Sequence, residues 1–412
     1  MIEIMSPVGS YESLAAAIHA GAGSVYFGVG KMNMRSRSAA NFTLNDLQNI
    51  TQTCRDNHVK SYLTVNTIIY NTEIEEVHQL LDYAKKCNIS AIIASDFAVL
   101  SYCKKIGLEI HISTQCNITN IEAVRFYAQF ADVVVLAREV ALSQAAVIAE
   151  QIKKEDIRGP KGELIRLEMF IHGALCMAVS GKCYLSLDNF NYSANRGACL
   201  QPCRRAYIVK DMENEYELAI DNKYIMSPKD LCTIGFLDKI LKAGVSILKI
   251  EGRGRSADYV KVTTECYHEA IQAIADGTYS PTRIAEWTER LSKVYNRGFW
   301  DGYYLGRKMG EWSKRYGSQA TTIREYRGKV TNYFTKLCVA EIFIETGELA
   351  VGDLISFEGP TTGIYETTIQ EIRVNLQSVP KAIKGESCSI LVKQLVRRGD
   401  KVYQKIQKIE EF

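Results

Sequence analysis

A chain of 412 residues is too long for one ordinary hydrophobic core, so the sequence predicts two or three domains. Hydrophobic residues make up 47% and charged residues 24%, which is the composition of a soluble globular enzyme. The net charge of +3 permits a nucleic-acid partner but is too small to prove one. Because no apolar run approaches the roughly 20 residues of a membrane span and no basic leader follows Met1, we expect a cytoplasmic protein without a membrane partner.

Short runs rich in Val, Ile or Tyr alternate with helical stretches from Met1 to about Leu305. The helical stretches place apolar residues near 3.6 positions apart, which is typical of amphipathic helices. Eight βα units predict an α/β fold, namely a (β/α)8 TIM-like barrel over residues 1–310, with a doubly wound open sheet as the alternative. The expected strands are Glu3–Met5, Ser24–Phe27, Ser61–Val65, Ala91–Ala94, Glu109–Ile112, Asp132–Leu136, Arg166–Phe170 and Ser246–Ile250.

The last part of the chain, residues 325–412, has short alternating runs with turn signals at Gly352-Asp353 and Gly399-Asp400. This pattern predicts a small C-terminal antiparallel β-barrel domain of six or seven strands. Small barrels of this kind often bind RNA, so we consider RNA binding by this domain. The alternative is a structural or dimerising role, and the latter would give a homo-oligomer. Before this domain we expect a helix over Arg283–Leu305 whose aromatic residues pack against the first barrel.

Polar residues or glycine follow every predicted strand of the first barrel. Arg138 and Glu139 follow the sixth strand, His172 follows the seventh, and Glu251 and Arg253 follow the eighth. In such barrels the functional residues gather at the C-terminal ends of the strands. We therefore predict a pocket at this end of the barrel.

Four cysteines are concentrated in about residues 174–207, a segment that follows the seventh strand and is predicted to insert over the barrel mouth: Cys176, Cys183, Cys199 and Cys203. In a reducing compartment such a cluster indicates a metal or redox site rather than disulfides. Four thiolates can bind a tetrahedral zinc ion or a [4Fe–4S] cluster. The gaps are six, fifteen and three residues, and only the last resembles a zinc knuckle. Spacing favours iron–sulfur and leaves zinc open.

Positively charged side chains flank these cysteines, namely Lys182, Arg196, Arg204 and Arg205. Their charge would stabilise thiolate ligands and could hold an anionic substrate or a phosphate backbone. A solvated basic surface is the alternative interpretation.

Several runs of residues resemble the peptidase U32 family, also called the collagenase-like proteases. Glu168–Cys176 and Ser180–Ser186 look like the family signature, and Asn195–Arg204 and Lys249–Arg253 match further blocks. The opening run Ser6–Gly28 looks like the first βα unit of the family. The resemblance covers the barrel, and the end of the chain looks like the C-terminal β-barrel domain of the family.

The resemblance implies an iron–sulfur protein that hydroxylates nucleic-acid bases or quinone precursors. The most similar type is the tRNA uridine hydroxylation proteins, which make 5-hydroxyuridine at the wobble position and depend on prephenate. A sibling group hydroxylates a cytidine of ribosomal RNA. By matching motifs, the ligands of the [4Fe–4S] cluster carry over to Cys176, Cys183, Cys199 and Cys203. Cys232 is the alternative to Cys203, as in the ubiquinone-pathway branch, but the intact run LQPCRR favours Cys203.

The resulting hypothesis is an iron–sulfur enzyme that hydroxylates C5 of a uridine exposed in a tRNA anticodon loop. Arginine forks match carboxylates, so the candidates for binding prephenate or RNA are Arg35, Arg138, Arg196, Arg204 and Arg253. The candidates for moving protons or positioning those arginines are His172, Glu139, Glu168 and Glu251.

Two other classes of function remain as alternatives. A U32-type peptidase would need an activated nucleophile or a metal-bound water, and the sequence has no GxSxG or HExxH motif for it. A non-catalytic RNA chaperone with a structural zinc would need only the basic residues and the small barrel. Both rank below base hydroxylation.

Overall fold

The computed structural model describes residues 2–37, 41–208, 224–306 and 310–408. Within these residues, eight parallel strands form a closed barrel, because β9 pairs with β1 on one side and with β7 on the other. This confirms the predicted TIM-like barrel and excludes the open sheet. The barrel strands are β1 (Glu3–Pro7), β2 (Ser24–Phe27), β3 (Lys60–Val65), β4 (Ala91–Ala94), β5 (Ile110–Ile112), β6 (Val133–Val135), β7 (Arg166–Ala174) and β9 (Val245–Ile250).

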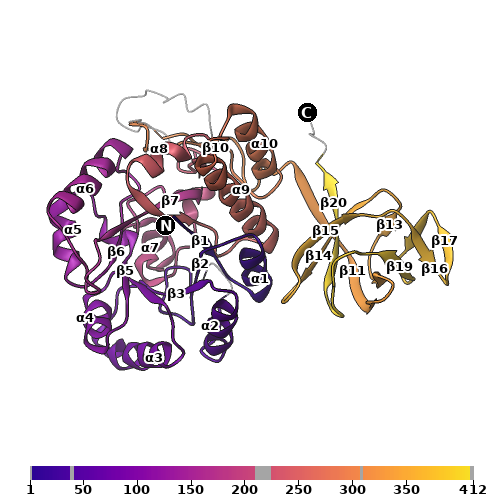
Figure 1. Cartoon of the computed structure of the whole chain (residues 1–412), viewed down its shortest axis with the longest axis horizontal. Coiled ribbons are helices and arrows are strands. Elements are labelled where there is room, and N and C mark those ends of the chain that lie inside the picture. The colour runs from indigo at the N-terminus through magenta and orange to yellow at the C-terminus, as the bar shows by residue number, and fades with distance from the viewer. Residues whose placement is uncertain (1, 38–40, 209–223, 307–309, 409–412) are drawn as a thin grey trace.

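Helices surround the barrel as a ring, which Figure 1 shows nearly end-on. Their amphipathic spacing explains the packing: one face of α3 buries Val77, Leu81 and Ala84, and its other face meets solvent. The strands carry continuous apolar runs because both of their faces are covered. The ring helices are α1 (Tyr11–His19), α2 (Asp46–Asp56), α3 (Ile74–Lys86), α4 (Phe97–Ile106), α5 (Ile121–Ala128), α6 (Leu142–Lys154), α8 (Leu237–Lys242) and α9 (Ala257–Ala275), with α10 (Pro281–Ser292) after them.

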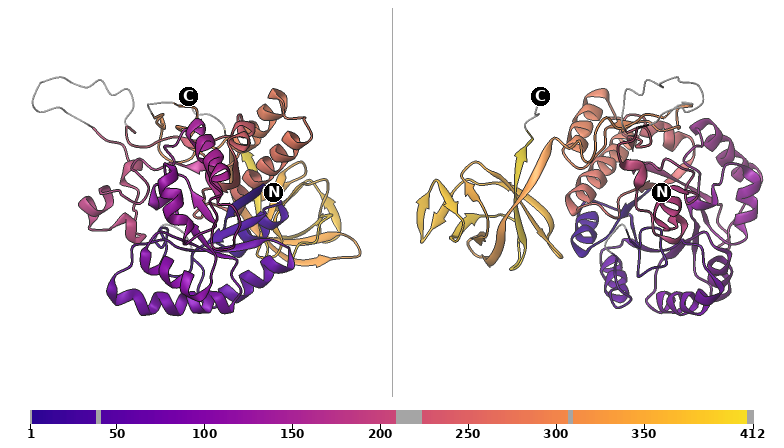
Figure 2. Two further views of the ribbon diagram at one scale, coloured as in Figure 1. Left: turned by 60° about the vertical axis from the view of Figure 1, so that its left-hand side comes forward. Right: turned by 180° about the vertical axis from the view of Figure 1, so that it is seen from behind.

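The connection between β7 and β9 carries the cysteine segment and a short strand that the sequence did not predict. This strand, β8 (Asp230–Cys232), runs antiparallel to the end of β7 and pairs with β10 (Phe299–Trp300). The cysteine segment includes the short helix α7 (Leu185–Phe190), which lies in the middle of the ring in Figure 1 and projects from the barrel in Figure 2.

The predicted helix over Arg283–Leu305 is wrong beyond Ser292, where α10 ends. The side chain of Asn296 donates to the carbonyls of Ser292 and Val294 and accepts from the amide of Gly298. These local bonds compete with helical ones, and Gly298 has a positive φ of 78°. The predicted packing of aromatic residues against the barrel is confirmed, since Trp300 and Tyr304 are both buried in the barrel core.

The C-terminal region forms a separate domain of antiparallel sheets, as Figure 1 shows. Its described residues contain ten strands rather than the six or seven expected, because several strands are only three residues long. Eight of them form one sheet around a core that includes Ile342, Phe357 and Val402. The strands are β11 (Thr322–Phe334), β12 (Val339–Ile344), β13 (Glu348–Ala350), β14 (Leu354–Gly359), β15 (Gly363–Thr368), β16 (Ile372–Val374), β17 (Gln377–Val379), β18 (Lys381–Ile383), β19 (Ser387–Leu391) and β20 (Lys401–Gln407).

The C-terminal domain contacts the barrel at α1 and α9. Gly363 approaches α1 so closely that an added Cβ would lie 2.9 Å from the amide nitrogen of Ala16. Arg324 on β11 pairs with Asp258 in the first turn of α9, at 2.9 Å, and with Glu358 on β14. The side chains of these three charged residues are no more than 17% exposed. This ion-pair triad therefore fastens the domain to the helix that follows β9.

We expect Arg324→Met to lower the free energy of unfolding by about 3 kcal/mol, because Asp258 and Glu358 would remain largely buried without their shared cation. Urea unfolding followed by circular dichroism measures this loss. The matched control is Arg373→Met, which removes an exposed pair with Glu371 and should leave stability unchanged. Equal unfolding midpoints for the two variants would contradict the assignment.

Candidate active site

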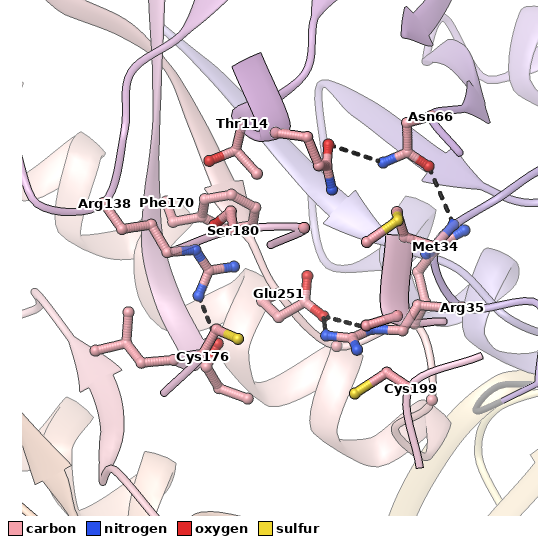
Figure 3. Close-up of a pocket in the computed structure, with 18 of the residues that line it drawn as sticks. Met34, Arg35, Asn66, Thr114, Arg138, Phe170, Cys176, Ser180, Cys199 and Glu251 are labelled. Carbon is pink, nitrogen blue, oxygen red and sulfur yellow. Dashed lines mark hydrogen bonds and ion pairs between the residues drawn. The ribbon is translucent and has the colours of Figure 1, made fainter. Parts of the chain in front are cut away.

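A cavity of about 280 Å³ lies at the C-terminal ends of the barrel strands and is partly covered by the cysteine segment. All four predicted ligands, Cys176, Cys183, Cys199 and Cys203, line it. All four are free thiols. Figure 3 shows Cys176 and Cys199 on opposite sides of the space, with Glu251 and Arg35 between them. The structure therefore brings the cysteines and the strand ends into one site.

Glycine and arginine hold the cysteine segment against the barrel. Gly197, with a φ of 80°, accepts hydrogen bonds through its carbonyl from the amide of Arg37 and the hydroxyl of Ser36. An added Cβ there would lie 2.4 Å from the carbonyl oxygen of Asn33, so only glycine permits this approach. The guanidinium of Arg204 donates to the carbonyls of Leu175, at 2.5 Å, and Pro228, at 2.7 Å.

The cysteines also influence one another electrostatically. Burial raises the pKa of the Cys203 thiol to about 11, the Arg204 charge opposes this, and Cys176, Cys199 and Cys183 raise the pKa further. Repulsion between neighbouring thiolates accounts for that last effect. Within the described ranges, no three His, Cys, Asp or Glu side chains are already arranged to hold a single metal ion. The donor set is four thiols around a shared space, which suits the corners of a cluster several ångströms across.

Arg35 and Glu251 form the central ion pair of the cavity. Nη2 and Nε of Arg35 lie 2.8 Å and 3.3 Å from Oε1 of Glu251, and the Tyr26 hydroxyl donates to Oε2 at 3.3 Å. Burial opposes the charge of Glu251, but Arg35, Arg138 and Arg253 together lower its pKa to about 2. The carboxylate is therefore ionised at neutral pH and orients Arg35.

Four further arginines line the cavity without forming an ion pair with any carboxylate of the described residues: Arg138, Arg204, Arg253 and Arg255. Arg138 donates to the carbonyl of Ala174 at 2.7 Å, lies 3.9 Å from the Phe170 ring centre, and leaves its buried Nε without a partner. Arg253 donates only to neutral oxygens, and burial lowers its pKa to about 10. Cations that share one distant carboxylate and form no ion pair of their own can bind an anion.

A buried network beneath the cavity fixes Lys249, which also lines it. Nζ of Lys249 lies 2.7 Å from Oε1 of Glu168, and Nδ1 of His111 lies 2.9 Å from Oε2 of the same carboxylate. Glu168 is completely buried and is not part of the cavity lining. It therefore positions Lys249 from below.

The other proposed site residues lie outside the cavity. His172 packs among Tyr259, Tyr267 and Phe299, and burial lowers its pKa to about 3, so the imidazole is neutral. Arg196 points away, forms two hydrogen bonds with Glu73 and ties the cysteine segment to the loop after β3. Glu139 is exposed beyond the end of β6. The structure brings none of these three to the thiols.

Asn66 and Gln115, two of the polar residues that follow predicted strands, also line the cavity. Sequence reasoning gave no role to four other polar lining residues: Thr64, Lys249, Arg255 and Arg297. Cys232 lies on β8 with its sulfur 4.0 Å from the Tyr267 hydroxyl, and it is not among the residues lining the cavity. The geometry therefore favours Cys203 over Cys232 as the fourth thiol.

Fold and site together define a TIM-like barrel protein with a thiol-rich, cationic cavity. The family model described as peptidase family U32 matches residues 9–314, and the chain belongs to this family. This confirms the resemblance seen in the sequence motifs. In the described part of the chain, no helix is long and apolar enough to cross a membrane.

Relatives of this chain carry two kinds of name. A protein named collagenase from Porphyromonas gingivalis is 58% identical over 98% of this chain and 97% of that protein. The tRNA hydroxylation protein P1 of Bacillus subtilis is 31% identical over 90% of this chain and 86% of that protein. The 23S rRNA 5-hydroxycytidine C2501 synthase of Escherichia coli is 30% identical over 75% of this chain and 46% of that protein.

The Glu251 pKa predicts a pH-dependent effect of Glu251→Gln. Because the folded pKa of about 2 lies below the ordinary 4.5, the ionised carboxylate stabilises the fold above about pH 4.5 and loses this effect as the pH falls towards 2. At neutral pH we expect the variant to be about 3 kcal/mol less stable than the wild type, and this difference should shrink on acidification. Urea unfolding at successively lower pH measures the difference.

The exposed Glu139 provides the control, since Glu139→Gln should show no such pH-dependent difference. A stability difference for Glu251→Gln that stays constant down to low pH would show that the carboxylate is not held by the three arginines.

Proposed function

We propose that this protein is an iron–sulfur tRNA modification enzyme that hydroxylates a wobble uridine to 5-hydroxyuridine with prephenate as co-substrate. One observation carries the proposal: four free thiols and four arginines that form no ion pair among the described residues line the same cavity at the catalytic end of a TIM-like barrel. Relatives named tRNA hydroxylation proteins support the substrate class. The enzyme would therefore be an oxidoreductase acting on RNA.

The thiols of Cys176, Cys183, Cys199 and Cys203 would hold a [4Fe–4S] cluster. A cluster bound there would supply electron transfer at the cavity. The chain surrounds the sulfurs with positive charge, because Arg35 and Arg204 both interact electrostatically with Cys176. Such charge favours the deprotonated thiols that a cluster requires.

The arginines would hold the co-substrate. Prephenate carries two carboxylates, and Arg138 and Arg253 approach the cavity without a carboxylate of their own. Glu251 is ionised and paired with Arg35, so it would repel both carboxylates of the ligand and leave the two guanidiniums as their favourable positions. The buried cations would also exclude a neutral ligand from this space, because a neutral ligand would leave their charge uncompensated.

The second candidate is a peptidase, favoured by the name of the relative that is 58% identical. Peptide hydrolysis needs a nucleophile next to a base. The buried histidines His111 and His172 instead contact Glu168 and Tyr267, beneath and beside the cavity. A ribosomal RNA cytidine is the alternative substrate within the hydroxylase class. The cavity chemistry favours hydroxylation.

Anaerobically purified protein should be brown and contain about four irons per chain. Replacing any one of Cys176, Cys183, Cys199 or Cys203 by serine should lose iron and colour, measured by metal analysis and visible absorbance. Cys232→Ser is the matched control, because its sulfur faces Tyr267 rather than the cavity, and it should keep the cluster. Iron lost from Cys232→Ser but kept in Cys203→Ser would move the fourth ligand to β8. A colourless zinc protein would refute the cluster.

tRNA from a strain lacking this protein should lack 5-hydroxyuridine and its derivatives, measured by mass spectrometry of nucleosides. The wild-type chain should restore them, and Arg138→Met should not, because one guanidinium for the co-substrate would be missing. Arg158→Met, which removes an exposed cation paired with Asp156 between α6 and β7, is the control and should restore them.

Two outcomes would contradict this assignment. Unchanged tRNA with altered hydroxycytidine in ribosomal RNA would move the substrate to the sibling class. Cleavage of collagen or casein by purified protein that survives Cys176→Ala would favour the peptidase.

A further inference from the structure

A second chamber of about 250 Å³ adjoins the cavity of the thiols. It lies between the loops after β3, β4 and β5 and the cysteine segment. The two spaces share five lining residues: Met34, Asn66, Gln115, Ser180 and Gly181. The chamber's own lining is Ile68, Ser95, Cys116, Tyr127, Lys182 and Asn195. A ligand in the chamber would therefore lie directly beside a ligand in the cavity.

The two spaces differ in charge. The cavity is lined by seven cationic side chains and Glu251: Arg35, Arg138, Arg204, Lys249, Arg253, Arg255 and Arg297. The chamber is lined by amides, hydroxyls, a thiol and apolar side chains, and Lys182 is the charged member of that lining. Because buried cations attract anions and a neutral lining does not compensate charge, the cavity suits an anion and the chamber suits a neutral polar group. The site is built for two different ligands.

The wall between the two spaces is held in place by close contacts. Gly181, with a φ of 79°, approaches Gln115 so closely that an added Cβ would lie 2.7 Å from its Cγ. Nδ2 of Asn66 donates to Oε1 of Gln115 and to the hydroxyl of Ser113, both at 3.3 Å, and Oδ1 of Asn66 accepts from the amide of Met34. The cysteine segment thus fixes the amide of Gln115 at the junction.

We propose that the chamber binds the target pyrimidine base of the RNA, flipped out of its loop, with uracil preferred over cytosine. This inference rests on the proposed function and adds the position of the base to it. Extruded RNA bases are held between apolar or aromatic faces and by hydrogen bonds to their edges. Tyr127, Met34 and Ile68 supply the faces.

The amide groups account for the preference for uracil. Among the described residues, Nε2 of Gln115 and Nδ2 of Asn195 donate no hydrogen bond. Oε1 of Gln115 accepts from Asn66 and Ser113, and Oδ1 of Asn195 accepts from Ser193. Uracil presents a carbonyl oxygen on each side of N3, and cytosine presents only one. Two amide donors therefore match uracil, and the exposed Lys182 lies where it can meet the backbone phosphate.

Photo-crosslinking tests the position of the base. The probe is an anticodon stem-loop RNA with 4-thiouridine at the wobble position, bound to the full-length protein and irradiated. Crosslinked peptides should contain Tyr127 or Ile68, which line the chamber and not the cavity, read by mass spectrometry. Tyr127→Ala should reduce RNA binding about tenfold through lost stacking. Ile68→Ala should also reduce RNA binding, and because Ile68 is exposed this substitution leaves the hydrophobic core intact.

Binding of prephenate to the same variants, measured by calorimetry, should stay unchanged, because Tyr127 and Ile68 do not line the cavity. Tyr102→Ala, an aromatic change on α4 outside the chamber, is the matched control and should affect neither ligand. Crosslinks confined to the C-terminal domain or to the cavity residues would overturn the inference while leaving RNA hydroxylation intact. Equal loss of RNA and prephenate binding in Tyr127→Ala would also overturn it. Crosslinks in the chamber of a protein that leaves tRNA unmodified would support the chamber and refute the proposed reaction.

Discussion

The buried ion pair between Lys249 on β9 and Glu168 on β7 is the interaction on which both barrel and site depend. β9 closes the barrel by pairing with β1 and β7, and the pair joins the two strands of that last seam at 2.7 Å, with side chains 5% and 0% exposed. Removing one member would leave an uncompensated charge, at a cost of about 3–5 kcal/mol. Glu251 and Arg253 lie two and four residues after Lys249. The pairing of β9 that closes the barrel therefore also positions these two residues in the cavity.

The separation of charge around the site follows from this arrangement. Glu168 neutralises Lys249 from below, and Glu251 neutralises Arg35 within the cavity, so these cations are compensated by the protein. Arg138 and Arg253 form no ion pair: their direct contacts are neutral oxygens and aromatic rings, and Glu251 attracts both from a longer distance. The uncompensated positive charge is confined to the cavity, because the adjoining chamber is lined mainly by amides, hydroxyls and apolar side chains. A site with a charged half and a neutral half is what a reaction between an anionic co-substrate and a nucleobase requires.

The sequence predicted the barrel and much of the site because both depend on local patterns. Arg35, Arg138, Glu251 and Arg253 follow strands, and parallel strands of a barrel all end on one face, so chain order alone placed them together. Ion pairs and strand pairings between residues far apart in the sequence could not be predicted from it. The direction of Arg196 depends on Glu73, and β8 exists only through pairing with the end of β7. His172 follows an irregularity in the register of β7 and β9, which decides the side to which it points.

The names of relatives do not by themselves select the reaction, because one fold supports many chemistries through residues placed at its strand ends. Relatives named as a collagenase and as a tRNA hydroxylation protein both align over 90% or more of this chain. What separates the two chemistries is the site: hydrolysis needs a nucleophile beside a base or a metal-bound water, whereas the proposed base hydroxylation would need a redox centre beside two bound ligands. Four thiols, a cationic cavity and an adjoining neutral chamber favour the second requirement over the first. The two kinds of name both show membership of the family, and the arrangement of side chains supports the proposed hydroxylation.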